Sequence, residues 1–193
     1  MTKTNNMTKA LLSTVVVALA IAVSFLSSCK KKDSTSTPVT TMTLYDSLGG
    51  TTMVADPYNP GQMVEAGRLG IRKVVDSTIF VIAGDTAINN YFTVLLAEVT
   101  GGNTTGFSAL SKNLTDFFCV ATGAKNFTYG GKNMTAAHDP AQNSRMNGKA
   151  DNSDFDAFVT DLVAGAHKVG LSDVIIGRVV AVVGTLRSQV VQR

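Results

Sequence analysis

The chain has 193 residues, and its 17 Lys and Arg against 14 Asp and Glu give a formal net charge of +3. Two of the bases, Lys3 and Lys9, precede an apolar run near the N-terminus, so the rest of the chain is almost neutral. No basic stripe interleaved with aromatic residues is present, which argues against a nucleic-acid-binding protein.

The N-terminal segment has the build of a bacterial export signal. Its charged start is followed by an apolar run of 17 residues, Ala10–Leu26, and then by small residues. The sequence Leu-Ser-Ser-Cys29 resembles the lipobox of bacterial lipoproteins, in which the Cys is acylated and becomes the new N-terminus. We therefore expect residues 1–28 to be a lipoprotein signal peptide, with the lipidated Cys29 opening a flexible polar tether over residues 29–42. A retained spanning helix is the alternative, but this run is at the lower limit for a span and leaves Cys29 unexplained.

Residues 43–193 predict a single, mainly helical domain. Apolar residues recur at helical spacing, for example at Leu110, Leu114 and Phe118. Polar segments rich in Gly, Asn and Pro separate such stretches and predict long loops. In chain order, the predicted helices cover residues 43–48, 67–83, 107–121, 133–138, about 152–169, and 172 to the last residue.

Residues that carry common enzymatic chemistry are sparse. The chain has two histidines, His138 and His167, and no His or Cys cluster with the spacing of a zinc site. It lacks a Gly-rich phosphate loop and a Gly-x-Ser-x-Gly elbow, so hydrolase and phosphate-binding activities have little support. Cys119 lies in an apolar run and is interpreted as a buried small side chain. By itself, His138 is open to two interpretations, a core residue or a ligand.

Several motifs in a recognisable order favour the ligand. The segment Tyr129-Gly-Gly-Lys-Asn-Met134-Thr-Ala-Ala-His138 has Tyr, Gly, Met and His at the spacing of the proximal segment of truncated haemoglobins of the first group. The chain resembles that family over about residues 43–191. Further resemblances lie at Thr43–Gly50, Ile71–Asp76, Asp85–Phe92, Asp116–Gly123 and Asp154–Phe155.

The resemblance implies an all-α fold, the two-over-two helical sandwich of a truncated globin, with extended loops between the helices. It implies haem as the cofactor and His138 as the proximal ligand of the iron. Phe92 and Met134 would pack on the macrocycle, and Tyr129 would reach a propionate. The distal wall would consist of Ile79, Leu110, Leu114 and Phe118.

The chain departs from the family at the distal wall and in its loops. Ile79 and Leu114 stand where members of the group often place donors that hydrogen-bond bound oxygen, and neither side chain can donate. This difference predicts weak retention of oxygen. Three insertions lengthen the loops without touching the motifs, and we interpret them as surface decoration. They cover residues 55–65, 93–106 and 139–150.

The resulting hypothesis is a haem-binding globin that reversibly binds diatomic gases (O2, NO, CO) through iron held by His138. As an exported lipoprotein, it would be anchored in membrane lipid by Cys29 and would face the periplasm or the cell surface. One alternative is a haem enzyme that removes nitric oxide or peroxide and requires an unidentified reductase. Another is a structural lipoprotein that has lost haem.

Overall fold

The computed structural model describes residues 42–193. The predicted signal peptide (1–28), the lipidation site Cys29 and the tether 29–42, apart from its last residue, lie outside the described residues. These three expectations therefore stay predictions from the sequence.

The described part begins with one short helical turn, α2 (Leu44–Ser47). Its start is fixed by a capping box, in which Thr43 Oγ1 accepts a hydrogen bond from the Asp46 amide and the Asp46 carboxylate accepts one from the Thr43 amide, both at 3.0 Å. The hydrogen bonds from Thr43 hold the pKa of Asp46 below its ordinary value. A Gly-Gly turn ends the element, as the sequence suggested, and Gly49 has a φ of +127°. A Cβ at Gly49 would lie 2.7 Å from the carbonyl carbon of Ala66, so only glycine lets the two segments approach this closely.

A small β-hairpin follows the Gly-Gly turn. Strands β1 (Met53–Ala55) and β2 (Met63–Glu65) pair antiparallel. The register places Met53 opposite Glu65, Val54 opposite Val64 and Ala55 opposite Met63. It is the only sheet within residues 42–193, so the prediction of an all-α domain is confirmed.

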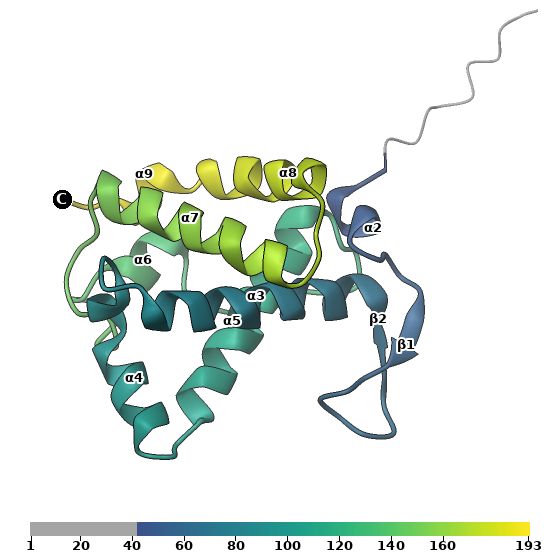
Figure 1. The fold of residues 1–193 in the computed structure, drawn as a ribbon, viewed down its shortest axis with the longest axis horizontal. Coiled ribbons are helices and arrows are strands. Elements are labelled where there is room, and N and C mark those ends of the chain that lie inside the picture. The colour runs from purple at the N-terminus through teal and green to yellow at the C-terminus, as the bar shows by residue number, and fades with distance from the viewer. Residues whose placement is uncertain (1–41) are drawn as a thin grey trace, which may run out of the picture. The chain divides into compact units, whose positions relative to one another are not determined.

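Four long helices form two packed pairs (Figure 1). Helix α3 (Ala66–Gly84) packs beside α5 (Thr105–Thr122), and α7 (Asn152–Lys168) packs beside α8 (Asp173–Gly184). The two pairs are joined mainly through α3 and α7, which make the most extensive contact in the domain. The core between the pairs is apolar and includes Ile71, Val75, Phe155, Leu162 and Val183.

Shorter helices connect these four. The 3-10 turn η1 (Asn89–Phe92) and α4 (Thr93–Thr100) lie between α3 and α5. Helix α6 (Met134–His138) lies between α5 and α7, and α9 (Arg187–Val190) follows α8. In Figure 1, α6 lies behind the N-terminal end of α7, and it contacts α9.

The structure corrects three local expectations. The last helix does not run to the final residue, because α8 ends at Gly184, a poor helix former, and the chain resumes as α9. The N-cap of α7 is Asp151 and not Asn152 or Ser153, the two caps that the sequence suggested, because the Asp151 carboxylate accepts from the amides of Ser153 and Asp154. Most of the insertion at residues 93–106 is helical, because its segment TVLLAEVT is largely apolar and packs on α5.

Within residues 42–193, no single helix is both long and apolar enough to cross a membrane. One pair of neighbouring segments would satisfy these criteria together, Ala66–Gly84 with Asn89–Thr100. The two are bent by 108° relative to each other, and the first of them supplies a large share of the domain core.

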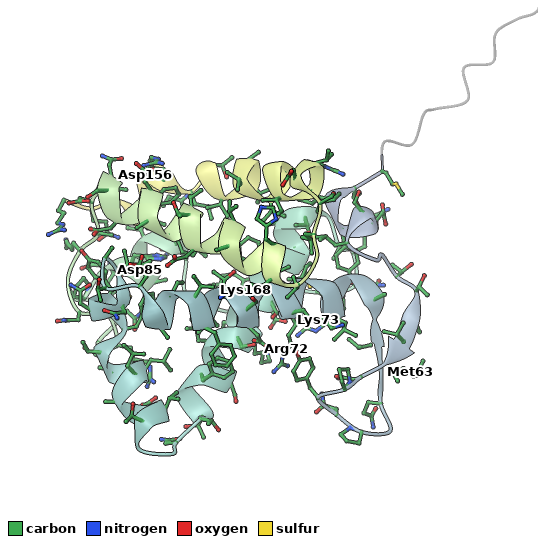
Figure 2. All side chains as sticks on the ribbon, in the orientation of Figure 1. Met63, Arg72, Lys73, Asp85, Asp156 and Lys168 are labelled. Atoms are coloured by element: carbon green, nitrogen blue, oxygen red, sulfur yellow. The ribbon has the colours of Figure 1, made fainter. Side chains whose placement is uncertain are left out.

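A buried carboxyl group on α7, close to a half-buried one at the end of α3, predicts that the stability of the domain depends on pH. Asp161 on α7 is 6 % exposed, and its Oδ2 has no hydrogen-bond partner among the described residues. Burial and the neighbouring carboxyl group of Asp85 raise the pKa of Asp161, although Lys168 opposes this. Asp85 is labelled at the end of α3 in Figure 2.

A raised pKa in the folded state favours the protonated carboxyl. Its stabilising effect is complete below the ordinary pKa of about 3.9 and is lost as pH rises through the higher folded value. We therefore expect Asp161→Asn to gain stability relative to the wild type as pH is raised from about 4 to 7. Thermal unfolding followed by circular dichroism over this range tests the prediction, and parallel pH profiles for the two proteins would contradict it.

Candidate functional site

An apolar cavity lies where α5, α6, η1, α7 and α8 meet. Most of the cavity wall is aromatic and aliphatic, and only a few polar side chains line it. This is the usual composition of a ligand site. It is lined by Ile88, Tyr91, Phe92, Leu114, Phe117, Phe118, Met134, His138, Met146, Ala150, Asp154, Phe155, Phe158, Val183, Leu186 and Val190.

His138 presents one free ring nitrogen in this setting. Its Nδ1 lies 2.8 Å from the carbonyl oxygen of Met134, and because a carbonyl oxygen only accepts, Nδ1 must carry the proton. In a neutral imidazole the lone pair is then on Nε2, which has no hydrogen-bond partner among the described residues. Burial lowers the pKa of His138, although the hydrogen bond to Met134 opposes this, so the ring is held in its neutral form. A neutral imidazole with a fixed tautomer and an unpaired Nε2 is the form that binds a metal.

The local sequence explains why His138 lies at the end of a helical turn. Asn133 caps α6, with its Oδ1 accepting from the Ala136 amide at 2.8 Å. Met134 and His138 are four residues apart and therefore share one face of the helix. Both line the cavity, so α6 presents this face to it.

The other polar side chains of the cavity wall pair with each other. The Tyr91 hydroxyl donates to Asp154 Oδ2 at 2.7 Å, and Arg193 donates to both of them at 3.1 Å and 3.0 Å. Burial and the hydrogen bond to Asp154 raise the pKa of Tyr91, so the phenol stays protonated. His138 is thus the side chain of this wall that offers an unprotonated ring nitrogen with no hydrogen-bond partner among the described residues.

Five of the eight residues predicted to contact a cofactor line this cavity together. They are Phe92, Leu114, Phe118, Met134 and His138. The sequence motifs predicted this grouping although the residues come from three separate elements, η1, α5 and α6.

Three predicted contact residues lie outside the cavity wall. The Tyr129 ring packs edge-on against Phe117 at 5.4 Å, and its hydroxyl donates to the carbonyl of Lys132 at 2.6 Å, within its own loop. Leu110 packs against the main core, and Ile79 lines a second cavity. The roles of these three residues as haem contacts stay predictions.

The second cavity adjoins the first. Leu114, Phe118 and Phe158 line both, and the second is otherwise enclosed by α3, α5, α7 and α8. Its volume of about 50 Å³ exceeds the roughly 10–15 Å³ that one buried water requires. Its wall is almost wholly apolar, and Thr78 Oγ1 has no hydrogen-bond partner among the residues described. This space suits a small, weakly polar molecule.

Part of the cavity wall comes from the segment between α6 and α7, which the sequence suggested to be surface decoration. Met146 and Ala150 of this insertion line the cavity. Asn147 binds it to η1, with its amide donating to Tyr91 O at 3.2 Å and its side chain to Asn90 O at 3.0 Å. In the sequence, the only local sign that this segment reaches the cavity is one Met, Met146, in an otherwise polar stretch. The contact of the segment with η1 depends on long-range packing.

The second histidine lies apart from the cavity wall. His167 is in the last turn of α7, its side chain is 51 % exposed, and its Nε2 lies 3.5 Å from Asp173 Oδ1. His167 is thus a half-exposed side chain close to the end of a helix, where a positively charged form is favourable. Within residues 42–193, no group of three or more His, Cys, Asp or Glu side chains is arranged to hold a metal ion.

Several solved structures have the same architecture. Truncated haemoglobin from Tetrahymena pyriformis, in its Fe(III) form, superposes with a TM-score of 0.55 at 22 % identity, covering 78 % of this chain and 99 % of that one. The 2/2 haemoglobin from Synechococcus sp. PCC 7002, in the cyanomet state with covalently attached haem, gives a TM-score of 0.54 at 23 % identity, with the same coverage. This chain has the truncated globin fold.

The paired long helices of this truncated globin fold are therefore α3 with α5 and α7 with α8. The predicted two-over-two sandwich is confirmed. No protein-family model matches the chain, and no curated protein sequence is significantly similar to it. The structural similarity is thus more informative than the sequence about the fold.

Proposed function

We propose that the protein binds haem and that His138 is the axial ligand of its iron. The observation that carries the proposal is the His138 ring in the apolar cavity, with Nδ1 bound to the Met134 carbonyl and Nε2 free. The truncated globin fold supports it, because the similar proteins from Tetrahymena and Synechococcus are haemoglobins.

The residues of the cavity fit a flat apolar macrocycle with one coordinating nitrogen. Phe92, Phe117 and Met134 offer aromatic and thioether surfaces, and His138 offers a neutral nitrogen donor. When bound, haem would supply an iron centre that can take up a small ligand. The apolar wall excludes water from that centre, and the bond from His138 to the Met134 carbonyl keeps the ring in one orientation.

We infer that the ligand is a diatomic gas and that its binding is reversible. Leu114 on α5 lines both cavities, and Ile79 on α3 lines the second, so neither of the positions predicted for a distal donor offers one. Oxygen carries partial negative charge when bound and would lack a hydrogen bond from these positions. Because an enzyme that consumes nitric oxide with bound oxygen requires that oxygen be retained, reversible gas exchange is proposed ahead of the enzymatic alternative.

A donor placed at Leu114 should slow oxygen release. A charge-assisted hydrogen bond contributes about 1.5–3 kcal/mol, so Leu114→Gln should lower the oxygen dissociation rate roughly ten- to a hundredfold. Carbon monoxide, which depends less on such a bond, should change little. Stopped-flow measurement of both rates tests this, with Leu114→Met as a control of similar volume that adds no donor. Equal oxygen dissociation rates in the two variants would contradict an apolar distal wall.

We also propose that the globin is carried as a lipoprotein, with the acylated Cys29 in membrane lipid. The support is the sequence Leu-Ser-Ser-Cys29 after the apolar run Ala10–Leu26. The domain would then face the periplasm or the cell surface.

The experiment that tests haem binding is an absorption spectrum of the protein after titration with haem. We expect a saturable Soret band in the ferric form, which shifts on reduction and again on addition of carbon monoxide. A folded protein that takes up no haem would overturn the proposed function and would leave the truncated globin fold unaffected.

A further inference from the structure

The helix that carries His138 is held in place by side chains that bind its carbonyl groups. Helix α6 has only five residues, so it is too short to be stable by itself and leaves most of its carbonyl groups without helical partners. Side chains bind three of these carbonyls. Met134 O accepts from His138 Nδ1 at 2.8 Å, Thr135 O from Gln192 Nε2 at 2.8 Å, and Ala137 O from Asn143 Nδ2 at 2.7 Å.

Among these contacts, only Gln192 connects α6 to a distant part of the sequence. Its backbone is fixed on the start of α7, because its amide donates to Ala150 O at 2.9 Å and Ala150 forms a parallel bridge with Val191. The next residue, Arg193, lies 3.1 Å from Asp151 and 3.0 Å from Asp154, both at the same end of α7. The Gln192 side chain therefore reaches α6 from a segment that is itself held rigidly on α7.

We propose that Gln192 is a positioning residue for His138 and acts through the carbonyl of Thr135. Thr135 and His138 lie on the same turn of α6, so a rotation of the turn about its axis redirects the imidazole. With Gln192 in place, α6 has one orientation relative to α7, whose side chains Phe155 and Phe158 form part of the cavity wall. This inference rests on the proposed role of His138 as an iron ligand.

The test uses the haem-loaded protein with Gln192→Ala and Gln192→Glu, both of which remove the donor. We expect the iron–histidine stretching band of the ferrous, gas-free protein to shift and broaden in resonance Raman spectra. Haem should dissociate about two- to tenfold faster, as expected for the loss of one neutral hydrogen bond. The spectral change is the decisive readout, because a contact that only stabilises the fold would leave the band unmoved.

Gln189→Ala is the matched control. Gln189 is exposed and lies three residues earlier, and within the described residues only its backbone takes part in hydrogen bonds. Its removal should leave both the band and the dissociation rate as in the wild type. If the wild type binds haem and the Gln192 variants match Gln189→Ala, the inference is wrong and the proposed function stands.

A haem-free measurement separates this inference from the proposed function. In the apoprotein, the amide protons of residues 134–138 should exchange faster in Gln192→Ala than in Gln189→Ala. If the wild type takes up no haem, the proposed function fails, and with it the role of Gln192 toward a ligand. Equal exchange in the two variants would independently show that Gln192 does not hold α6.

Discussion

Replacing His138 by Ala should abolish the haem complex proposed for this protein. The variant loses the imidazole Nε2 that has no hydrogen-bond partner among the described residues, while the apolar surfaces of the cavity wall stay in place. Loss of outer partners of metal ligands already lowers affinity about 10- to 100-fold, so loss of the ligand itself should lower haem affinity by more than about a hundredfold. Residual haem should show an altered Soret band that no longer has the spectrum of a histidine complex.

The second histidine of the domain, His167, provides a control for this substitution. His167→Ala removes a half-exposed imidazole at the end of α7 and should leave the spectrum unchanged. Free imidazole added to His138→Ala should restore much of the wild-type spectrum, because the cavity made by the truncation has room for the ring. A normal carbon monoxide spectrum in His138→Ala, or its loss in His167→Ala, would refute the assignment of the ligand.

Because the pKa of His138 is lowered, we expect haem to be retained at a more acidic pH than with an exposed histidine as ligand. Iron binds the unprotonated Nε2, and protonation of the ring competes with the metal. Because burial lowers the pKa of His138, this competition begins only at a more acidic pH than for an exposed histidine. Haem should therefore be retained into mildly acid solution, and an acid titration followed at the Soret band measures this directly.

Replacing Gly165 by Ala should markedly destabilise the protein. At this position α7 crosses α3 so closely that a Cβ would lie 2.5 Å from Thr78 Oγ1 and 2.8 Å from the Thr78 backbone. Because backbone atoms cannot rotate away, the helices must separate. Overpacking of this kind costs about 1–3 kcal/mol and often more where backbone is involved.

Gly177→Ala in α8 is the matched control, since it makes the same substitution in a helix with no atom within 4 Å of the added Cβ. It should stabilise the protein by about 0.5–1 kcal/mol, because alanine favours the helix over glycine. Urea unfolding followed by far-ultraviolet circular dichroism compares the two variants. Equal stability of Gly165→Ala and Gly177→Ala would show that the α3–α7 contact is not as close as described.

The α3–α7 contact also bears on the candidate site. Ile79 follows Thr78 on α3 and lines the second cavity, and Phe158 on α7 lines both cavities. A wider separation of these helices should therefore enlarge the apolar space next to the proposed haem site. The glycine that permits close packing thus limits the volume of the second cavity.

Local sequence patterns gave most of the helices and the centre of the site. The 3.6-residue spacing of apolar side chains is a property of neighbouring residues, so helices α3, α5 and α7 were placed to within a few residues. The spacing from Tyr129 to Met134 and His138 is equally local, and in the structure Met134 and His138 both line the cavity.

Tertiary structure decided the rest of the site. Met146 and Ala150 join the cavity wall because Asn147 binds their loop to η1, more than fifty residues away in sequence. Tyr129, by contrast, turns its hydroxyl to a nearby carbonyl, which a spacing rule does not reveal. Such contacts depend on how helices cross, and no short sequence window contains both partners.

The sequence by itself therefore determined the helical class of this protein and the order of its elements, and it predicted His138 as a metal ligand, because each depends on residues within a few turns of each other. Only the tertiary structure decided which side chains enclose that ligand, how closely α3 and α7 approach at Gly165, and that Gln192 holds α6. The physical reason is that packing and long-range hydrogen bonds are set by the whole fold, whereas helix formation and capping are set locally.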